Sequence, residues 1–288
     1  MKNNMKEIYI NPQCCWYGQT EADKYLKVQR YRRKKYEYSP TKKYSDIIDS
    51  VNENGYAKIE NFIEKHRLDR ILAAFNKIKQ NNELQYDDVY TEQVGHPLLT
   101  CDGVFDVAFE NKIIEIAGEY FDCLPAINNV QLRKSKSTHL KENQLPKNGQ
   151  TTLWHCDKDS PRFLKFFFYL TNVDEGNGPF TYVHQSHKNK FDGWRSKYRW
   201  SDKEVIEKFG QDRIVKLYGK PGDLILANTN GFHKGTKIEI GERILLTVYT
   251  GIHPTEWTKL GGKMKNSDYL TLPDWKKPIA AYIKKEPK

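Results

Sequence analysis

The chain of 288 residues is long enough for one large domain or two small ones. Its mean hydropathy of -0.80, with no apolar run near ~20 residues, excludes a transmembrane segment. The net charge of +10 would suggest nucleic-acid binding if it were spread over the chain. It is concentrated at the ends, with nine Lys or Arg against one Glu in residues 24–43 and seven Lys against three acids in residues 263–288. Residues 44–262 are nearly neutral, so no nucleic-acid partner is expected.

This charge distribution predicts a central domain at residues 44–262, between a basic helical N-terminal extension (1–43) and a basic C-terminal extension (263–288). The basic ends could contact an anionic surface, although solvated segments that aid solubility are the simpler interpretation. The first residues lack the apolar stretch of a signal peptide, and five scattered cysteines form neither a disulfide framework nor a C-x-x-C zinc motif. We therefore expect a cytoplasmic protein.

Helical periodicity dominates the first part of the chain. Thr20 resembles an N-cap with an acidic residue three positions later, and Ser39-Pro40 ends the helix that it opens. Apolar stripes at helical spacing predict further helices, whereas residues 55–59 are expected to form a short strand and residues 81–104 to be irregular. The predicted helices are Glu21–Tyr36, Ser45–Val51, Ile63–Lys79 and Phe109–Phe121.

From Leu124 the pattern changes to that of β-strands, separated by clusters of Gly, Pro, Asn and Asp. Helices followed by many short strands predict a mainly β fold in which helices buttress one antiparallel barrel. The predicted strands are Ala126–Lys134, Arg162–Asn172, Pro179–Val183, Arg213–Tyr218, Asp223–Ala227 and Arg243–Thr250. The mouth of such a barrel suits a metal site because it combines rigid strands with an enclosed cavity.

The stretch from Trp154 to Asp157 contains the clearest candidate metal ligands. Side chains alternate along a strand, so His155 and Asp157 project to the same side and can reach one ion. The third candidate is His233, just after the strand-like run at 222–227. Other candidates for this third position are His139, His184, His187 and His253. Two His and one carboxylate that leave coordination positions open form the facial triad of non-haem Fe(II) oxygenases.

Arg243 lies ten residues after His233, at the start of an otherwise apolar strand. A charge in that position needs a partner, and a planar guanidinium suits a bidentate pair with a carboxylate. We therefore expect Arg243 to bind a ligand carboxylate beside the metal. A pair with a surface acid is the alternative.

Several motifs occur in a fixed order in the second half of the chain. They are His155-x-Asp157, the run Phe163–Val173 followed by Gly178-Pro179-Phe180, the segment Ser186-His187-Lys188, and Gly231-Phe232-His233 with Arg243. Over roughly residues 45–255 this series resembles the phytanoyl-CoA dioxygenase-type Fe(II)/2-oxoglutarate oxygenases.

The resemblance implies a double-stranded β-helix, or jelly-roll, with Fe(II), 2-oxoglutarate and O2 as cofactor and cosubstrates. It also implies that Arg243 pairs with the distal carboxylate of 2-oxoglutarate. Asp157, in place of Ala or Gly, implies hydroxylation or another oxidation rather than halogenation. Family members often have Ser or Thr two residues after the distal His, and here that position is Gly235, with Thr236 next.

The strand from Phe163 is bulky on both faces, so we expect one face to line the barrel and the other to pack under helices. Lys165 and Phe167 share a face, and a Lys is costly to bury there unless it meets an anion. Both are candidate contacts to 2-oxoglutarate, although Lys165 could instead snorkel from the strand edge. On the preceding strand Gln131 and Arg133 share a face, as candidate contacts to the cosubstrate and to the substrate.

The segment between Lys188 and Gly210 mixes aromatic residues with Arg and ends in a predicted short helix. Its position between two strands suits a lid over an anionic or flat substrate. Packing of its Trp residues on the outside of the barrel is an equal alternative. The candidate substrate residues in this segment are Trp194, Arg195 and Trp200, with Tyr198 and Arg199 as further members of the same cluster.

The leading hypothesis is an Fe(II)/2-oxoglutarate-dependent dioxygenase that hydroxylates or otherwise oxidises a small, polar or anionic metabolite and converts 2-oxoglutarate to succinate. One alternative is a non-catalytic jelly-roll binding module. Another is an oxygenase acting on a nucleic acid or a protein. The demethylase branch carries a second Arg six residues after the clamp, where this chain has Tyr249, so a small-molecule substrate is favoured.

Overall fold

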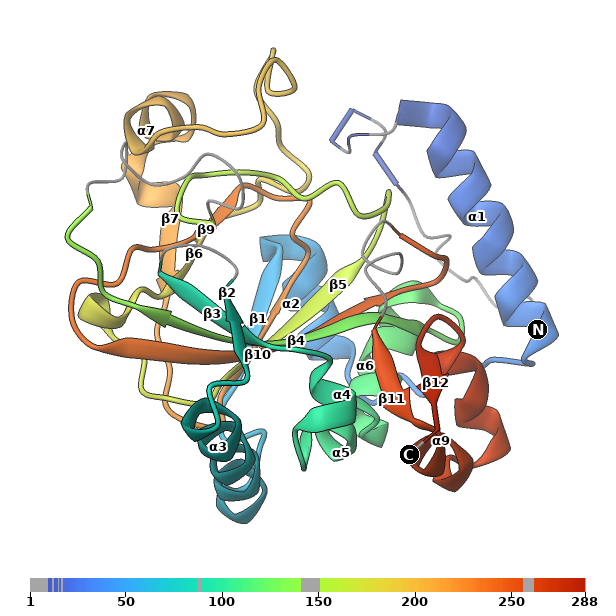
Figure 1. The fold of residues 1–288 in the computed structure, drawn as a ribbon. Coiled ribbons are helices and arrows are strands. Elements are labelled where there is room, and N and C mark those ends of the chain that lie inside the picture. The colour runs from blue at the N-terminus through green and yellow to red at the C-terminus, as the bar shows by residue number, and fades with distance from the viewer. Residues whose placement is uncertain are drawn as a thin grey trace.

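The computed structural model describes residues 10–287, apart from residues 12, 15, 17, 87–89, 141–150 and 256–261. At its centre two β-sheets pack face to face through a shared apolar cluster (Figure 1). The larger sheet is antiparallel with the order β1-β8-β5-β10-β4-β3-β2, and the smaller has the order β7-β6-β9. Isolated bridges of His155 with His233 and of Trp154 with Trp200 continue the smaller sheet beyond β9.

The strands of the larger sheet are β1 (Tyr56–Ile59), β2 (Leu84–Tyr86), β3 (Thr91–Val94), β4 (Ala126–Lys136), β5 (Leu164–Tyr169), β8 (Leu224–Ala227) and β10 (Glu242–Gly251). Those of the smaller sheet are β6 (Phe180–Val183), β7 (Ile214–Leu217) and β9 (His233–Gly235). The expected antiparallel β fold with buttressing helices is confirmed, and the strand bounds differ from the predicted ones by a few residues.

Alternation along β5 separates the two faces of the larger sheet. Phe166 and Phe168 belong to the main core beneath the helices, whereas Phe167 and Tyr169 belong to the cluster between the two sheets. Register carries this division across neighbouring strands, because Thr247 of β10 is opposite both Phe167 of β5 and Gln131 of β4. All six side chains of β5 are buried, as expected for a strand covered on both faces.

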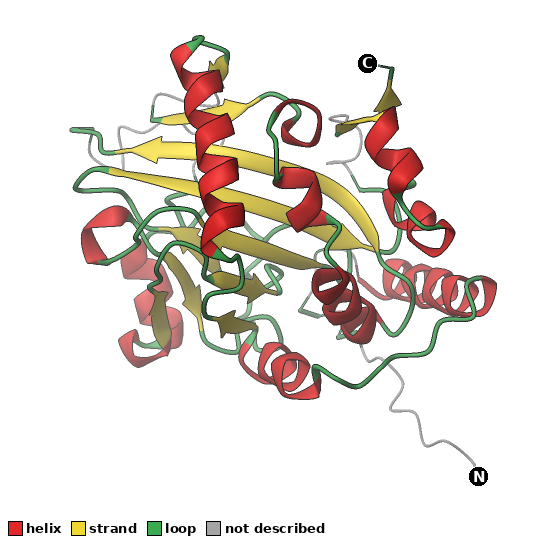
Figure 2. Cartoon of the chain, turned by 90° about the horizontal axis from the view of Figure 1, so that it is seen from below, coloured by secondary structure: helices red, strands yellow, loops and turns green. Residues whose placement is uncertain are grey.

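Helices cover the outer face of the larger sheet (Figure 2). Their apolar stripes supply Val51, Phe75 and Phe121, among others, to the core that also contains Phe166 and Phe168. The helices are α1 (Gly18–Lys35), α2 (Ser45–Asn54), α3 (Lys65–Gln80), α4 (Pro97–Thr100), α5 (Val104–Ala108), α6 (Asn111–Phe121), α7 (Asp202–Phe209) and α9 (Asn266–Thr271). Short 3-10 turns are η2 (Glu175–Asn177), η3 (Gln211–Arg213) and η4 (Asp274–Ala280).

The basic helix α1 is docked on the rest of the molecule through one face. Ala22 and Tyr25 of this face join the main core, and the guanidinium of Arg32 is 2.8 Å from the carbonyl oxygen of Leu124 and 2.9 Å from that of Pro125. Residues near the C-terminus also pack on the core, through Met264 and Ile279 among others, and β11 (Lys263–Lys265) pairs in parallel with β12 (Lys284–Glu286). Contact of the basic ends with an anionic surface stays a prediction.

The segment 81–104 was expected to be irregular, and the structure contradicts this. It contains β2, β3 and α4, and α5 begins at its last residue. Strand β3 is polar (Thr91–Val94) and exists because it pairs with β4, with Thr91 opposite Ser135. A polar strand of this kind carries little periodic signal, since its conformation depends on the neighbouring strand.

No helix in the described part of the chain is long and apolar enough to cross a membrane.

Replacing Arg32 by Ala should lower the free energy of unfolding by about 2–3 kcal/mol, because two buried carbonyl groups lose a charged donor. Urea unfolding followed by circular dichroism measures this. The matched control is Arg30→Ala on the exposed face of the same helix, which should change stability by less than about 0.5 kcal/mol. Equal effects of the two substitutions would show that Arg32 does not anchor α1.

Candidate active site

The three candidate metal ligands lie together between the two sheets. One donor atom from each of His155, Asp157 and His233 lies within 4.8 Å of the others, and all three residues are buried. Nε2 of His155 is 3.8 Å from Oδ1 of Asp157, and Nε2 of His233 is 3.5 Å from Oδ2 of Asp157. Among the described residues, none of the four alternative histidines belongs to this cluster.

Backbone pairing brings these ligands together from two distant segments. The amide of His155 donates to the carbonyl of His233 at 3.1 Å, and the amide of His233 donates to the carbonyl of His155 at 3.0 Å. The amide of Asp157 donates to the carbonyl of Thr229 at 2.9 Å. In such an antiparallel pair the two opposite side chains lie on the same face, which places both imidazoles next to each other with ring centroids 4.3 Å apart.

The turn before His233 depends on a glycine. A Cβ on Gly231 would lie 1.8 Å from the hydroxyl of Tyr182 and 2.9 Å from Oγ of Ser186, so no larger residue fits without rearrangement. The hydroxyl of Tyr182 donates to the carbonyl of Asn228 at 2.8 Å, and Oγ of Ser186 accepts from the amide of Phe232 at 2.8 Å. The Ser-His and Gly-Phe-His motifs of the sequence are therefore in direct contact.

Hydrogen bonds assign the tautomer of both imidazoles. Nδ1 of His155 is 2.8 Å from the carbonyl oxygen of Leu153, and Nδ1 of His233 is 2.9 Å from that of Gly231. A carbonyl oxygen only accepts, so each Nδ1 carries the proton and each Nε2 keeps its lone pair. Backbone carbonyls orient many metal-binding histidines in this way.

The electrostatics favour the protonation states that a metal requires. Burial lowers the pKa of His233 to about 4, and burial together with the neighbouring His233 and Arg199 lowers the pKa of His155 well below its usual value. Burial alone would raise the pKa of Asp157, but Lys165 and the two imidazoles hold it well below its usual value. Near neutral pH the site thus offers two neutral imidazoles and one carboxylate, a donor set that fits Fe(II).

Lys165 points inward against the metal-ligand carboxylate. Its Nζ lies 2.7 Å from Oδ2 of Asp157, 2.9 Å from Oδ2 of Asp159 and 4.4 Å from the ring centroid of Tyr249. Burial would lower the pKa of Lys165, but the two carboxylates raise it. The structure contradicts the snorkelling alternative, because Lys165 is only 4% exposed. The sequence pattern did not lead to Asp159, although it lies two residues after Asp157 and the same i, i+2 spacing had identified His155 and Asp157.

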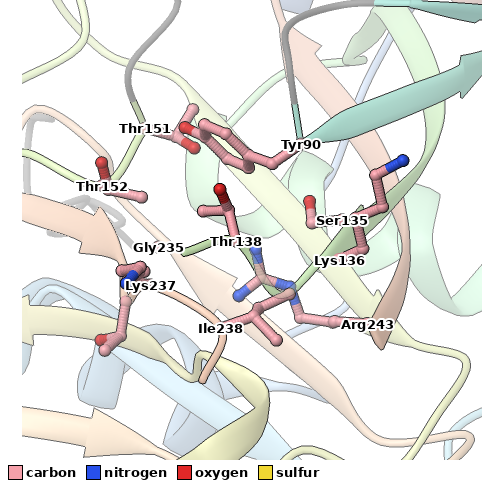
Figure 3. Close-up of a pocket in the computed structure, with 11 residues that line it drawn as sticks. Tyr90, Ser135, Lys136, Thr138, Thr151, Thr152, Gly235, Lys237, Ile238 and Arg243 are labelled. Atoms are coloured by element: carbon pink, nitrogen blue, oxygen red, sulfur yellow. The ribbon is translucent and has the colours of Figure 1, made fainter. Parts of the chain in front are cut away.

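Arg243 reaches a polar pocket next to the ligand strands. Its guanidinium donates to the carbonyl of Gly178, and its buried Nε has no hydrogen-bond partner among the described residues. Gly235 allows the guanidinium of Arg243 to approach the backbone closely, because a Cβ at this position would be 3.3 Å from Nη2 of Arg243. Figure 3 shows the guanidinium surrounded by the hydroxyl-bearing side chains of the pocket. These are Tyr90, Ser135, Thr138, Thr151, Thr152 and Thr236, of which Figure 3 labels all but Thr236.

This pocket carries the kinds of donor that bind a carboxylate. It combines a buried cation with hydroxyl donors, and its walls include Gly235, two residues beyond His233. Thr236, rather than the residue two beyond the distal His, supplies a hydroxyl to the pocket lining. Its Oγ1 also lies 2.7 Å from Oγ1 of Thr181.

The remaining candidate residues, Gln131, Arg133 and Phe167, lie on strands β4 and β5 of the larger sheet. Gln131 accepts a hydrogen bond of 2.6 Å from the hydroxyl of Tyr249, and Phe167 packs against Phe180 with ring centroids 4.8 Å apart. Phe180 in turn is 5.6 Å from the ring of His233. Arg133, half-buried, is opposite Leu245 of β10 and Gln93 of β3. Their contacts to cosubstrate and substrate stay predictions.

The Trp residues of the segment 188–210 lie in a buried apolar cluster with Trp154 and Phe232. Trp154 and Trp200 are paired by backbone hydrogen bonds of 3.0 and 2.9 Å, so alternation directs both away from the side on which His155 projects. Trp194 donates through Nε1 to the carbonyl of Gln13 at 3.2 Å. The structure therefore favours the packing alternative for Trp194 and Trp200.

Other residues of this segment lie closer to the metal ligands. The ring centroid of Tyr198 is 6.1 Å from that of His155 and 5.9 Å from that of Trp16. Arg195 is exposed, with its Nη2 3.2 Å from the carbonyl oxygen of Gln13. Trp16, which the sequence analysis did not single out, donates through Nε1 to the carbonyl of Cys156 at 3.1 Å.

The family model described as phytanoyl-CoA dioxygenase (PhyH) matches residues 51–238. The chain belongs to the phytanoyl-CoA dioxygenase family. Family membership, together with the triad of His155, Asp157 and His233, makes it an Fe(II)/2-oxoglutarate-dependent dioxygenase. The resemblance drawn from the sequence motifs is thereby confirmed.

Similar solved structures support the jelly-roll fold of this dioxygenase. The epimerase SnoN, in complex with Fe3+, alpha ketoglutarate and nogalamycin RO, is 14% identical with a TM-score of 0.56, covering 72% of this chain and 82% of SnoN. The carbocyclase SnoK from nogalamycin biosynthesis is 15% identical with a TM-score of 0.53, covering 75% and 85%.

HygX from Streptomyces hygroscopicus, with nickel, 2-oxoglutarate and hygromycin B bound, is 14% identical with a TM-score of 0.52, covering 73% of this chain and 87% of HygX. A search of curated protein sequences finds no match.

Metal binding by this dioxygenase should persist to unusually acidic pH. Because burial lowers the pKa of His233 to about 4, its Nε2 remains unprotonated well below the ordinary histidine value of about 6.5. Cobalt(II) binding, followed by visible absorption, should be unchanged from pH 7 to about 5 and decline near pH 4. Circular dichroism at each pH separates ligand protonation from acid unfolding. Loss of binding near pH 6.5 in folded protein would contradict this.

Replacing Lys165 by Met should leave two buried carboxylates without their cation and destabilise the metal-free protein by roughly 3–5 kcal/mol. Metal binding then supplies the missing positive charge, so the increase in melting temperature on adding cobalt(II) should be larger than in the wild type.

Lys134→Met is the matched control for this variant. Lys134 is also buried and pairs with Glu92 and Glu242, at 3.4 and 3.1 Å, but it belongs to the other face of the sheet. It should destabilise the protein without changing the metal-induced increase. An equal metal-induced increase in both variants would contradict a role of Lys165 at the metal ligand.

Proposed function

We propose that this dioxygenase oxidises a small, polar or anionic metabolite, with Fe(II) held by His155, Asp157 and His233 and 2-oxoglutarate held by Arg243. The observation that carries this proposal is the adjacency of the buried triad and the Arg243 pocket, joined through β9 at His233 and Gly235. A single bound dicarboxylate can use both. Hydroxylation is the simplest outcome, and the substrate's identity determines the regiochemistry.

Neighbouring residues orient the metal ligands and set their protonation states without a bound ligand. Leu153 and Gly231 hold each imidazole with Nε2 free, and Lys165 keeps the carboxylate of Asp157 ionised. The iron and 2-oxoglutarate, when bound, supply the oxidation: O2 gives one oxygen atom to the substrate C–H bond and the other to 2-oxoglutarate, which becomes succinate and CO2.

Apolar residues on the inner faces exclude water from this region. Phe180 lies next to the ring of His233 and packs against Phe167, and Thr247 and Tyr249 are buried on the same face of the larger sheet as Phe167. A dry surround strengthens the charge interactions of Arg243 with a carboxylate and protects the substrate from solvent. Gln131 and Phe167 are proposed to contact the cosubstrate, and Arg133 the substrate.

A small-molecule substrate is in keeping with similar structures, in which SnoN binds nogalamycin RO and HygX binds hygromycin B. Tyr249, at the position of the second Arg of the demethylase branch, is engaged with Gln131 and Lys165. A cytoplasmic location stays a prediction.

The decisive measurement is anaerobic addition of Fe(II) and 2-oxoglutarate to metal-free protein, with the visible charge-transfer band as readout. Replacing Arg243 by Ala removes a bidentate charge-assisted pair, so the Kd of 2-oxoglutarate should rise about 10- to 100-fold while cobalt(II) affinity is retained.

Arg67→Ala serves as the control, because Arg67 pairs with Glu110 on the helical side of the molecule and should leave the Kd unchanged. A folded wild-type protein without a band would refute the proposal. If instead the band forms equally in Arg243→Ala, another residue binds the carboxylate.

A further inference from the structure

Arg199 follows Tyr198, whose ring centroid lies 6.1 Å from that of His155. Trp154 and Trp200 form an antiparallel bridge in which each amide donates to the other carbonyl. Extending this pairing by one residue on each side places Arg199 opposite His155. His155 is in turn opposite His233, and opposite residues share a face. The pairing geometry therefore directs Arg199 to the same side as the two histidines.

The guanidinium of Arg199 is incompletely used within the protein. Its Nε and Nη1 are inaccessible to solvent and have no hydrogen-bond partner among the residues that the structure describes. Its carbon Cζ lies 4.2 Å from the ring centroid of Tyr198. Buried donors without a partner are costly, which favours a ligand that supplies the acceptor.

The surroundings of Tyr198 and Arg199 are aromatic and cationic. Nζ of Lys158 lies 4.5 Å from the ring centroid of Tyr198 and 4.1 Å from that of Trp16. The nearby acids are already engaged, since Asp157 and Asp159 both contact Lys165.

Arg199 is distinct from the residue that we assign to the cosubstrate. Arg243 comes from β10 of the larger sheet, and the described residues that line its pocket do not include Arg199. The site thus has two separate guanidinium groups with buried nitrogen atoms that lack a hydrogen-bond partner among the described residues. A single dicarboxylate held between the triad and Arg243 leaves Arg199 for a second anion.

We infer that Arg199 binds an anionic group of the substrate, a carboxylate or a phosphate, and so positions the substrate beside the metal. This inference rests on the proposed function, because it takes 2-oxoglutarate as the ligand of Arg243. It narrows the substrate class to small anions, and it makes Arg199 a specificity-determining residue that neutral analogues cannot satisfy.

The test uses manganese(II)-loaded protein with saturating 2-oxoglutarate and measures 19F relaxation of small fluorinated probes. Paramagnetic manganese accelerates the relaxation of a probe bound nearby. Trifluoroacetate is the carboxylate probe, monofluorophosphate the phosphate probe and trifluoroacetamide the neutral control. Enhanced relaxation of at least one anion, but not of the amide, is expected, and the stronger anion identifies the natural group.

Arg199→Gln should weaken the binding of that anion about tenfold, since it removes a charge-assisted hydrogen bond. Arg199→Lys keeps the charge but not the planar fork, so it should retain part of the binding. Lys197→Gln is the matched control: it removes one charge from the same segment, where Lys197 is exposed and pairs with Glu204, and it should bind as the wild type does. Circular dichroism and the Kd of 2-oxoglutarate check that each variant is folded.

The outcomes separate this inference from the proposed function. If 2-oxoglutarate does not bind the metal-loaded wild type, the proposed function fails first. If 2-oxoglutarate binds normally but neither anion relaxes faster than the amide, the inference is wrong. It is equally wrong if Arg199→Gln leaves the anion enhancement unchanged, which would indicate direct coordination to manganese, or if it weakens 2-oxoglutarate as Arg243→Ala does.

Discussion

The backbone pair between His155 and His233 is the constraint on which the active site depends. Two reciprocal hydrogen bonds, of 3.1 and 3.0 Å, join segments that are far apart in the sequence and bring both imidazoles to one face. The carbonyls of Leu153 and Gly231 then orient the rings, and the packing of Gly231 against Tyr182 fixes the turn that precedes His233. The metal ligands are thus positioned by backbone geometry before a metal binds.

A second consequence of this arrangement is a set of buried charges with complementary roles. Lys165, from the larger sheet, contacts the carboxylate of Asp157 on the opposite side of the interior, so it links the two sheets electrostatically as well as holding the ligand ionised. Arg243, which donates to the Gly178 carbonyl, and Arg199 are less completely paired within the protein. Burying a cation without a full set of partners costs free energy, so such groups indicate candidate binding sites.

The two faces of the larger sheet have different roles, since one packs against the helices and the other faces the active site. One face packs Phe166 and Phe168 under helices and supplies most of the stabilising burial, whereas the other presents Lys165 and Phe167 to the interior. Strict alternation on a rigid strand keeps these tasks separate, since a one-residue slip would move Lys165 into the apolar core. Helix α1 adds to the outer layer through Arg32, so part of the basic N-terminal segment has a structural role.

The sequence by itself determined the main helices and strands outside residues 81–104, the faces of β5 and the metal triad, and it singled out Arg243. These follow from local rules: the helical and strand periods, the i and i+2 spacing of His155 and Asp157, and an ordered series of motifs. Asp159 was within reach of the same spacing rule and was overlooked. The polar strand β3 was not predictable, because its pairing with β4 rather than its own composition makes it a strand.

Only the tertiary structure decided the partners of the buried charges. The sequence left open whether Lys165 snorkels or meets an anion, and the approach of the two sheets places its Nζ 2.7 Å from Asp157. It left open whether Trp194 and Trp200 cover a substrate or pack on the outside of the barrel, and the structure places both in the apolar cluster with Trp154 and Phe232. Register between distant segments sets which side chains meet, and register depends on packing across the whole fold rather than on any local pattern.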